Sequence, residues 1–433
     1  MTAAHELVAV MNGVPIGTVA RERNGQLHFE YADEWRQRPD AIPLSLSMPL
    51  LRAVHPHAAI DAFLWGLLPD NEQTLARWAA RFQVSARNAF GLLTHIGEDC
   101  AGAVQFVPTE RLPTLQRPAD DDIVWLDEAE IGERLRALRQ DPSATRRATD
   151  HGQFSLAGAQ PKTALLLRDR RWSVPAGRTP TTHILKPTTA AFDGHAENEH
   201  FCLALARRLG LPVARSELRR FDGEAAIVVA RFDRIERQEQ WLRVHQEDLC
   251  QALAVSPTRK YQSDGGPGPL TIVELLRTHS SAPSRDVDTF IDALAFNWLI
   301  VGTDAHAKNY ALLFGRGGRI RLAPLYDLGS ALPYPALHQD KLAMAMKIGN
   351  TYRLRDIRRH HWESLLRGSR VNAEAALARM AGMADALPDH ASDLARSMRD
   401  GGIDHPILQQ LPALLAESAR EKGRWIAQTP WRA

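Results

Sequence analysis

Six polar or small residues between two apolar runs carry the side chains that phosphoryl transfer requires. In the stretch VGTDAHAKNYALL, residues 301–313, Asp304 is a candidate base for an acceptor hydroxyl, and Asn309, five residues later, is a candidate metal ligand. An Asp and an Asn at this spacing, on a loop after a buried helix, are typical of protein-kinase catalytic loops. The stretch therefore predicts the catalytic loop of a kinase.

A second carboxylate follows in the order that a kinase needs. The segment YALLFGRGGRIRLAP is typical of a β-hairpin and leads into LYDLGSAL, where Asp327 precedes Leu328 and Gly329. In protein kinases the Asp of the corresponding Asp-Phe-Gly element binds Mg²⁺. Either Asp alone could be a turn or cap residue, but the loop, the hairpin and the second Asp in this order favour a kinase.

A cation for the ATP phosphates is expected on a strand of the smaller lobe. The segment HILKP supplies Lys186, although a Lys that ends a strand is usually a solvated strand end. The next segment, AENEHFCLALARRL, predicts a helix, and its Glu197 or Glu199 could pair with Lys186, with Glu199 favoured. His195 and His200 are five residues apart and do not share a helix face, so solvent-facing residues are expected there rather than a metal site.

The segment expected to cover the phosphates is unusual for a kinase. In place of a G-x-G-x-x-G loop, FSLAGAQPKTALLL sets the small residues Ala157, Gly158 and Ala159 ahead of a strand. Small side chains let backbone N–H groups approach phosphate oxygens, although a Gly at this place is also common in simple turns. Lys162 could be a second cation or a residue of the strand edge.

Three parts of the chain are expected to position these residues. Residues 1–110 are typical of a β-meander followed by helices, and the pair Asn12-Gly13 predicts a tight hairpin turn. Residues 123–240 predict a small α+β lobe with strands, two helices and a hairpin. Residues 241–433 are expected to be mostly helical.

One helix of the middle part is defined in detail by its sequence. In LDEAEIGERLRALRQD, Asp127 can cap the helix and Glu130 completes a capping box. Ile131, Leu135 and Leu138 recur at helical spacing. The pattern predicts an amphipathic helix that packs this face on a sheet.

The composition is that of an ordinary globular protein. Hydrophobic residues make up 44% and charged residues 24% of the 433, and the net charge of +2 argues against a dedicated polyanion binder. Three widely spaced cysteines predict neither a disulfide framework nor a Cys-rich metal site. The first residues lack a signal-peptide pattern and the most apolar stretch, 290–301, is too short for a membrane span. We therefore expect a cytoplasmic protein with no membrane contact.

Together these motifs make the sequence resemble the HipA family, the Ser/Thr kinase toxins of bacterial type II toxin–antitoxin pairs. The resemblance is carried by FSLAGAQPK, THILKP, NEHFCLALA, VVARFDR, QEDLCQALAV, KYQSDGGPG, TDAHAKN and YDL, and nearer the N-terminus by PLSLSMPL and IGEDCAGAV. It implies an α+β, two-lobed protein-kinase-like fold. The small mixed N-lobe and mostly helical C-lobe would carry an appended β-rich N-terminal subdomain.

The resemblance also implies a role for each site residue. Asp304 would be the catalytic base, and Asn309 and Asp327 would hold Mg²⁺. The implied ATP-binding residues are Ala157, Gly158, Ala159, Gln160, Pro161 and Lys162 of the nucleotide loop, Lys186, the hinge residues Ala230, Arg231 and Phe232, and His306, Ala307, Lys308, Asn309, Tyr326 and Asp327. Ala305 stands where the family more often has Gly, and Ala230 replaces an acidic residue, so only a backbone role is implied there.

Ser155 matches the serine that family members autophosphorylate, which expels the loop and stops ATP binding. A phosphate group beside other phosphates is repelled and cannot stay buried. The resemblance implies ATP and Mg²⁺ as cofactors. It also implies a HipB-like helix-turn-helix antitoxin that tethers the toxin to operator DNA, and a protein target such as an aminoacyl-tRNA synthetase, notably the glutamyl enzyme, with growth arrest and persistence as the result.

Two other functions stay open. A small-molecule kinase of the aminoglycoside or choline type also has an Asp-to-Asn catalytic loop, although the AGAQ loop and Ser155 argue against it. The chain could also be a catalytically silent subunit that helps an antitoxin repress its operon. The presence of Asp304, Asn309, Asp327 and Lys186 together argues against inactivity.

Overall fold

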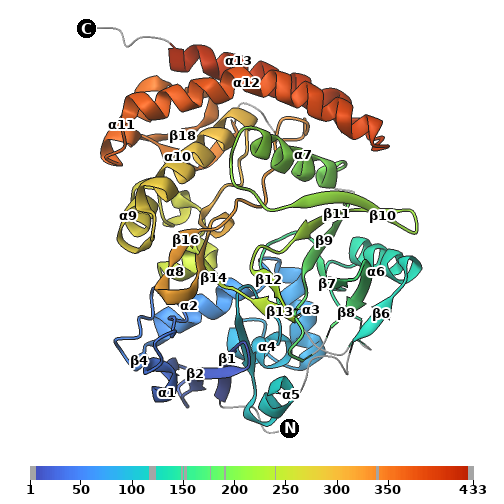
Figure 1. Ribbon diagram of the computed structural model, residues 1–433, viewed down its shortest axis with the longest axis vertical. Coiled ribbons are helices and arrows are strands. Elements are labelled where there is room, and N and C mark those ends of the chain that lie inside the picture. The colour runs from blue at the N-terminus through green and yellow to red at the C-terminus, as the bar shows by residue number, and fades with distance from the viewer. Residues whose placement is uncertain are drawn as a thin grey trace. The chain divides into compact units, whose positions relative to one another are not determined.

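The chain divides into two compact units in a computed structural model. The structure describes residues 6–116, 123–147, 150, 154–175, 177–189, 192–238, 240–337 and 341–427. The first unit takes Met1–Pro187, Arg219–Thr258 and Ala311–Ile320, and the second takes Thr188–Leu218, Arg259–Tyr310 and Arg321–Ala433 (Figure 1). Each unit is therefore assembled from segments that are distant in sequence.

The first unit begins with an antiparallel five-stranded sheet of order β4-β3-β2-β1-β5. Its strands are β1 (Glu6–Met11), β2 (Val14–Arg21), β3 (Leu27–Tyr31), β4 (Val54–His55) and β5 (Val104–Val107), and the helices of this part are α1 (Asp33–Arg36), α2 (His57–Leu67), α3 (Glu72–Phe82), α4 (Ala89–Ile96) and α5 (Leu112–Gln116). Asn12 and Gly13 have φ of 48° and 84°, which confirms the predicted turn between β1 and β2. The core under this sheet includes Phe29, Phe63 and Phe106.

A six-stranded sheet of order β10-β11-β9-β7-β8-β6 carries the predicted middle helix. Its strands are β6 (Val124–Leu126), β7 (Thr163–Arg168), β8 (Arg171–Val174), β9 (His183–Pro187), β10 (Ser216–Phe221) and β11 (Glu224–Ala230), with α6 at Glu128–Gln140. The capping box of Asp127 and Glu130 is present in α6. Ile131 and Leu135 lie in the core with Leu165, so the predicted apolar face is confirmed.

The predicted hairpin after the catalytic loop is part of a larger sheet. β15 (Ala311–Phe314) and β16 (Ile320–Leu322) are joined by β14 (His245–Asp248), which pairs antiparallel with β15. The remaining elements of this region are the hairpin β12 (Arg234–Arg237) and β13 (Gln240–Arg243), and the short helix α8 (Leu249–Ala252). Sequence patterns did not indicate β14, because its partner strand lies more than sixty residues away.

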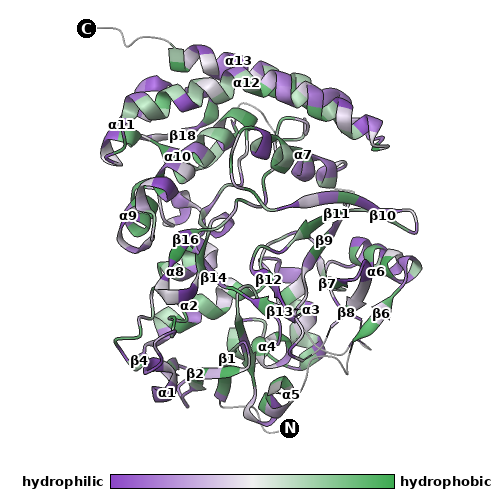
Figure 2. Cartoon of the chain, in the orientation of Figure 1, coloured by the Kyte–Doolittle hydropathy of each residue, from purple (hydrophilic) through white to green (hydrophobic). Residues whose placement is uncertain are grey.

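The second unit is mostly helical. Its helices are α7 (His195–Arg208), α9 (Pro269–His279), α10 (Pro283–Ile300), α11 (Arg359–Gly368), α12 (Ala373–Asp400) and α13 (Ile407–Ala427), and a two-stranded sheet is formed by β17 (Ala343–Ile348) and β18 (Thr351–Arg353). The long helices α12 and α13 lie side by side and both contact α10 (Figure 1). Figure 2 shows polar and apolar residues alternating along α12 and α13, as expected for helices with one buried face.

Single turns of 3₁₀ helix are η1 (Thr109–Arg111), η2 (Pro257–Arg259), η3 (Gln262–Asp264), η4 (Ala307–Asn309), η5 (Arg316–Gly318) and η7 (Leu354–Asp356). Within the described residues, no helix combines the length and the apolar character that crossing a membrane would take.

A buried network of charges ties distant segments of the first unit together. Asp99 is 5% exposed and accepts hydrogen bonds from Arg234 (2.9 Å) and Arg243 (3.2 Å), and from the hydroxyl of Thr181 (2.6 Å). Asp233 pairs in turn with Arg234 (2.9 Å). Burial acts to raise the pKa of Asp99, but the nearby guanidinium groups outweigh it and hold the pKa below its usual range. The network therefore stabilises the unit only while both signs of charge are present.

We expect Asp99→Asn to destabilise the protein by about 3–5 kcal/mol, because it leaves buried arginines without their carboxylate. Chemical denaturation of wild type and variant measures the loss. The matched control is Asp40→Asn, which removes an exposed partner of Arg38 and should have little effect.

We also expect the free energy of unfolding to decrease at acidic pH, and we expect Asp99→Asn to remove the part of this decrease that is due to Asp99. The pKa of Asp99 in the folded protein lies below its unfolded value of about 4. The ionised carboxylate therefore contributes fully to the free energy of unfolding above about pH 4, and this contribution is lost as the pH falls through the folded pKa. The free energy of unfolding of each protein is measured by denaturation between pH 7 and pH 3. An equal decrease in wild type and Asp99→Asn over this range would contradict this account.

Candidate phosphotransfer site

The candidate catalytic loop starts where α10 ends. Val301 caps the helix in the left-handed region, with φ of 58°. The N–H of Gly302 donates to the carbonyl of Asn297 at 2.7 Å. A Cβ on Gly302 would lie 2.3 Å from the side-chain oxygen of Asn297, so a larger residue here would require the buried Asn297 side chain to move. The backbone leaves the helix in a defined direction immediately before Asp304.

The last carbonyls of α10 are taken by side chains from distant segments. Lys422 and Ser418 of α13 donate to the carbonyls of Trp298 (2.6 Å) and Leu299 (2.7 Å). The hydroxyl of Ser330 donates to the carbonyl of Ile300 at 2.6 Å. Burial lowers the pKa of the Lys422 ammonium to about 7. The carbonyl of Trp298 also accepts the N–H of Val301 at 3.3 Å, and the serine hydroxyls pair the carbonyls of Leu299 and Ile300 at this buried helix end.

Asp304 extends from this loop toward solvent, with its side chain 68% exposed. The phenol of Tyr261 donates a short hydrogen bond to its Oδ1. Nε2 of His306 lies 3.7 Å from the same oxygen. The side-chain amide of Asn309 donates to the backbone carbonyl of Asp304 at 2.7 Å. The candidate base and the candidate metal ligand are thus parts of one hydrogen-bonded turn.

Asp327 lies on a segment bonded to that turn. The phenol of Tyr326 donates to the carbonyl of Lys308 at 2.7 Å, and the N–H of Ala331 donates to the carbonyl of Val301 at 3.0 Å. Asp327 itself has φ of 52°, a conformation that costs energy for most residues other than glycine and that occurs in turns and at functional sites. The structure therefore brings Asp304, Asn309 and the segment of Asp327 together in the second unit, while their roles stay predictions.

The family substitution at Ala305 has no backbone consequence. The sequence resemblance implies Gly where this chain has Ala305, and that difference matters only at positive φ. Ala305 is not one of the described residues that have a positive φ. Ala305, His306, Ala307 and Lys308 are all buried.

The candidate nucleotide loop lies in the first unit and is held closely. Ser155 is fully buried, its hydroxyl donates to the carbonyl of Leu67 (2.7 Å), and its N–H donates to the carbonyl of Asp99 (3.0 Å). The ring of Phe154 is also buried beside it. The serine expected to be phosphorylated is therefore inside the protein in this conformation.

The glycine of this loop lies in the backbone region that favours glycine. Gly158 has φ of 104°, and a Cβ there would lie 2.4 Å from Nζ of Lys162. Lys162 donates to the carbonyl of Ala157 at 2.6 Å and so closes the loop on itself. Gln160 and Pro161 lie between these contacts, and both are half-buried.

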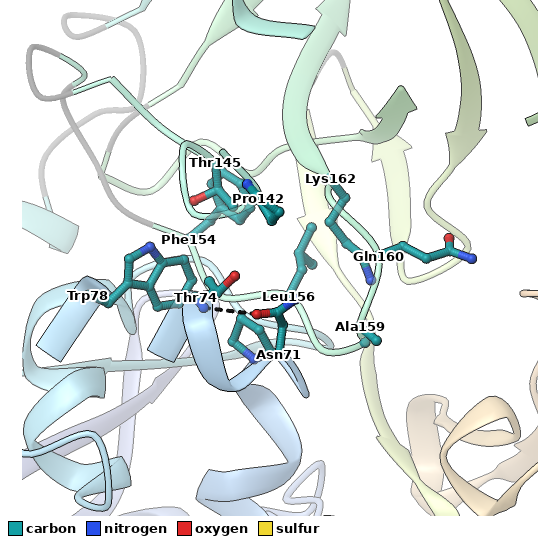
Figure 3. A pocket seen from close by; sticks show the side chains of 12 residues that line it. Asn71, Thr74, Trp78, Pro142, Thr145, Phe154, Leu156, Ala159, Gln160 and Lys162 are labelled. Carbon is teal, nitrogen blue, oxygen red and sulfur yellow. Dashed lines mark hydrogen bonds between the residues drawn. The ribbon is translucent and has the colours of Figure 1, made fainter. Parts of the chain in front are cut away.

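Behind the loop is a small cavity of about 10 Å³, room for about one water molecule. Figure 3 shows Asn71, Thr74 and Trp78 on one side of it and Leu156 and Lys162 of the loop on the other. A nucleotide needs far more space. The cavity is a packing gap under the loop.

Lys186 and the expected hinge also belong to the first unit. Lys186 lies in β9 opposite Ile227 of β11, and its side chain is buried. Ala230 ends β11, and Arg231 follows with its guanidinium in the network around Asp233. The N–H of Arg231 donates to the carbonyl of Thr182 at 2.9 Å. That amide is therefore engaged within the sheet.

The prediction of solvent-facing residues at the start of α7 is wrong. Glu197 and Glu199 are only 5% and 2% exposed, and His195 and His200 are half-buried. Burial lowers the pKa of His200 to about 4, and its Nδ1 lies 2.9 Å from the hydroxyl of Ser216. The five-residue spacing predicts that the two histidines lie on different faces of the helix. It does not indicate which tertiary contacts bury this end of the helix.

Sequence reasoning missed Tyr261 as a neighbour of the catalytic loop. Its motif, KYQSDGGPG, contributes to the family resemblance and is typical of a structural or substrate-facing loop, but the motif does not predict a contact with Asp304. Tyr261 lies 43 residues before Asp304, and no local pattern predicts such a contact. The same holds for Lys422 and Ser418, which look like ordinary polar residues of an amphipathic helix.

The fold and this arrangement of residues define a protein of the protein-kinase-like class. The chain belongs to the HipA family: residues 154–391 match the HipA-like C-terminal domain, and residues 7–107 match the HipA N-terminal domain. The resemblance inferred from the sequence motifs is thereby confirmed.

Several relatives support this assignment. A Sinorhizobium fredii protein, Y4mE, whose name describes it as a candidate kinase, is 37% identical over 91% of this chain and 92% of its own length. The Ser/Thr-protein kinase toxin HipA of Shewanella oneidensis is 32% identical over 73% of this chain and 72% of its own. The solved complex of Shewanella oneidensis HipA, HipB and operator DNA contains a chain similar to this one, with a TM-score of 0.82, 23% identity, and coverage of 97% of this chain and 98% of that one. The expected α+β, kinase-like fold is confirmed.

We expect Ser155→Asp to release the nucleotide loop, because a carboxylate cannot replace a fully buried hydroxyl without losing its hydration. Hydrogen–deuterium exchange should show faster exchange in peptides that cover residues 154–162. Ser155→Ala is the control, because it removes one hydrogen bond worth about 1 kcal/mol and adds no charge. Equal protection in the Asp and Ala variants would contradict this reading of the loop.

Proposed function

We propose that this chain is an ATP-dependent Ser/Thr protein kinase that acts as the toxin of a HipBA-type toxin–antitoxin pair. The observation that carries the proposal is the hydrogen-bonded turn of Asp304 and Asn309, with the Asp327 segment bonded to it through Tyr326 and Lys308. This order and spacing is that of protein kinases, and a relative 32% identical to the chain is named a Ser/Thr-protein kinase toxin.

In the proposed reaction Asp304 accepts the proton of the acceptor hydroxyl. Its exposed carboxylate can reach a hydroxyl presented from solvent, which a general base must do within hydrogen-bond distance. Lys186, the nucleotide loop Ala157–Lys162 and His306 to Lys308 would bind the phosphates, and the backbone at Ala230–Phe232 would meet the adenine. These roles follow the family resemblance.

Asn309 and Asp327 suit the Mg²⁺ that the family implies. The amide nitrogen of Asn309 donates to the carbonyl of Asp304, which turns the amide oxygen toward other partners. A carboxylate and an amide oxygen are ligands that Mg²⁺ accepts, together with water and phosphate oxygens. When bound, the ion would neutralise charge on the ATP phosphates.

Phosphorylation of Ser155 would switch the kinase off. A phosphate carries about −1.5 to −2 charge, and the hydroxyl it would replace is fully buried between Leu67 and Asp99. The modified residue would have to leave this position and take the nucleotide loop with it. Autophosphorylation on Ser155 is therefore proposed as self-inactivation.

The proposed partners follow from the relatives. The Shewanella oneidensis chain was solved with HipB and operator DNA, so we propose a HipB-like antitoxin that brings this chain to operator DNA. The proposed target is a translation component in the cytoplasm, such as an aminoacyl-tRNA synthetase and in particular the glutamyl enzyme. We also propose the division into residues 1–110, 123–240 and 241–433 as N-terminal subdomain, N-lobe and C-lobe.

We expect Asp304→Asn to lower phosphate transfer by about 10²- to 10⁴-fold, the usual contribution of a general base. Incorporation of labelled phosphate from ATP into protein measures the rate, and growth after induction measures toxicity. Asp264→Asn is the matched control, because Asp264 is exposed on a neighbouring loop. Toxicity that survives Asp304→Asn would contradict a catalytic toxin, and label found only on small metabolites would favour a small-molecule kinase.

A further inference from the structure

We infer that Tyr261 is a positioning residue that holds Oδ1 of Asp304, so that the carboxylate presents Oδ2 to the acceptor hydroxyl. The inference rests on the proposed kinase function and adds to it a residue that lies on a separate loop, 43 positions before Asp304.

The contacts of Asp304 distinguish its two carboxylate oxygens. The phenol of Tyr261 donates to Oδ1, and Nε2 of His306 lies 3.7 Å from that same oxygen. An exposed carboxylate otherwise turns easily about its last torsion, which has a broad energy profile. A donor held on Oδ1 removes this freedom and directs Oδ2 away from the phenol.

The phenol can hold the carboxylate because its own ring is held. The ring of Tyr261 packs edge-to-face on His306, with centroids 4.9 Å apart, and His306 is buried. Neighbouring backbone joins the two loops, since the N–H of Ala307 donates to the carbonyl of Lys260 at 3.3 Å. Tyr261 is thus held against the candidate catalytic loop by the packing of its ring on His306 and by the backbone hydrogen bond of the preceding residue, Lys260.

The loop that carries Tyr261 is also tightly folded. The carbonyl of Tyr261 accepts hydrogen bonds from the N–H groups of Asp264 (3.0 Å) and Gly266 (2.9 Å). A Cβ on Gly266 would lie 2.1 Å from the carbonyl oxygen of Arg259, so this turn needs glycine. Gln262, the next residue, accepts a hydrogen bond from the N–H of Lys347 at 2.7 Å. The GGPG part of the motif therefore shapes the turn that presents Tyr261.

In the proposed phosphate transfer, Tyr261 orients the Asp304 carboxylate. The acceptor hydroxyl oxygen bonds to the γ-phosphorus as the bond from that phosphorus to the β–γ bridging oxygen breaks. The hydroxyl proton passes to Oδ2 of Asp304, and ADP leaves with the bridging oxygen. The Tyr261 phenol keeps its proton throughout, so its contribution is orientation, and misplacing a catalytic group by about 1 Å can cost about a hundredfold in rate.

Tyr261→Phe separates this role from a structural one, because phenylalanine keeps the ring on His306 and loses only the hydroxyl. With the full chain, labelled ATP and myelin basic protein as the acceptor probe, we expect kcat to fall about 10- to 100-fold and the KM for ATP to stay within about twofold. Tyr352→Phe is the matched control, because it removes a phenol whose ring faces Lys347, and it should retain wild-type kcat. Unchanged kcat in Tyr261→Phe, or a change in KM alone, would overturn the inference while leaving the kinase function standing.

A spectroscopic measurement reads the contact without any activity. The chain has six tyrosines, and 3-fluorotyrosine labelling gives each a ¹⁹F resonance, with those of Tyr261 and Tyr352 assigned by their loss in the Phe variants. Asp304→Asn should shift the Tyr261 resonance and leave that of Tyr352 in place. A Tyr261 resonance that does not respond to Asp304→Asn would refute the contact, and a responsive resonance in a chain that transfers no phosphate would refute the proposed function instead.

Discussion

The C-terminal end of α10 is the constraint on which the candidate site depends. A helix that ends inside a protein must have its last carbonyls paired, and here Lys422, Ser418 and Ser330 supply the donors. Ser330 belongs to the segment that follows Asp327, so the same bonds that finish the helix also place that segment beside the catalytic loop. The stability of a helical core and the geometry of a polar site are therefore set by one group of hydrogen bonds.

Asp99 has a comparable double role in the first unit. Its carboxylate balances the buried arginines at 231, 234 and 243, while its backbone carbonyl accepts the N–H of Ser155. The candidate nucleotide loop is thus attached to a residue that pairs with three buried arginines. We expect a charge introduced at Ser155 to displace the loop, because the arginines hold Asp99 in place. Such a two-state arrangement suits a switch.

Local features of the sequence predicted local structure well. The Asp127 capping box, the Asn12-Gly13 turn and the spacing of Asp304 and Asn309 each depend on a few adjacent residues, and the structure has the helix, the turn and the loop. Burial of Glu199 and the contact of Tyr261 depend on residues that are distant in sequence. Periodicity and turn chemistry do not contain that information, because it arises only when segments pack. The motif KYQSDGGPG contains Tyr261, but the motif alone does not indicate which residues Tyr261 contacts.

We propose that side chains from two segments of the second unit hold one nucleotide-bound ion. The most direct test is a crystal structure of the chain with a non-hydrolysable ATP analogue and Mn²⁺ in place of Mg²⁺, with the ion located by its anomalous scattering. We predict one ion with the side-chain oxygens of Asn309 and Asp327 among its ligands, at about 2.1 Å, and the Asp304 carboxylate nearby but outside the first coordination shell. An ion bound elsewhere, or Asn309 and Asp327 directed to different places, would contradict the account.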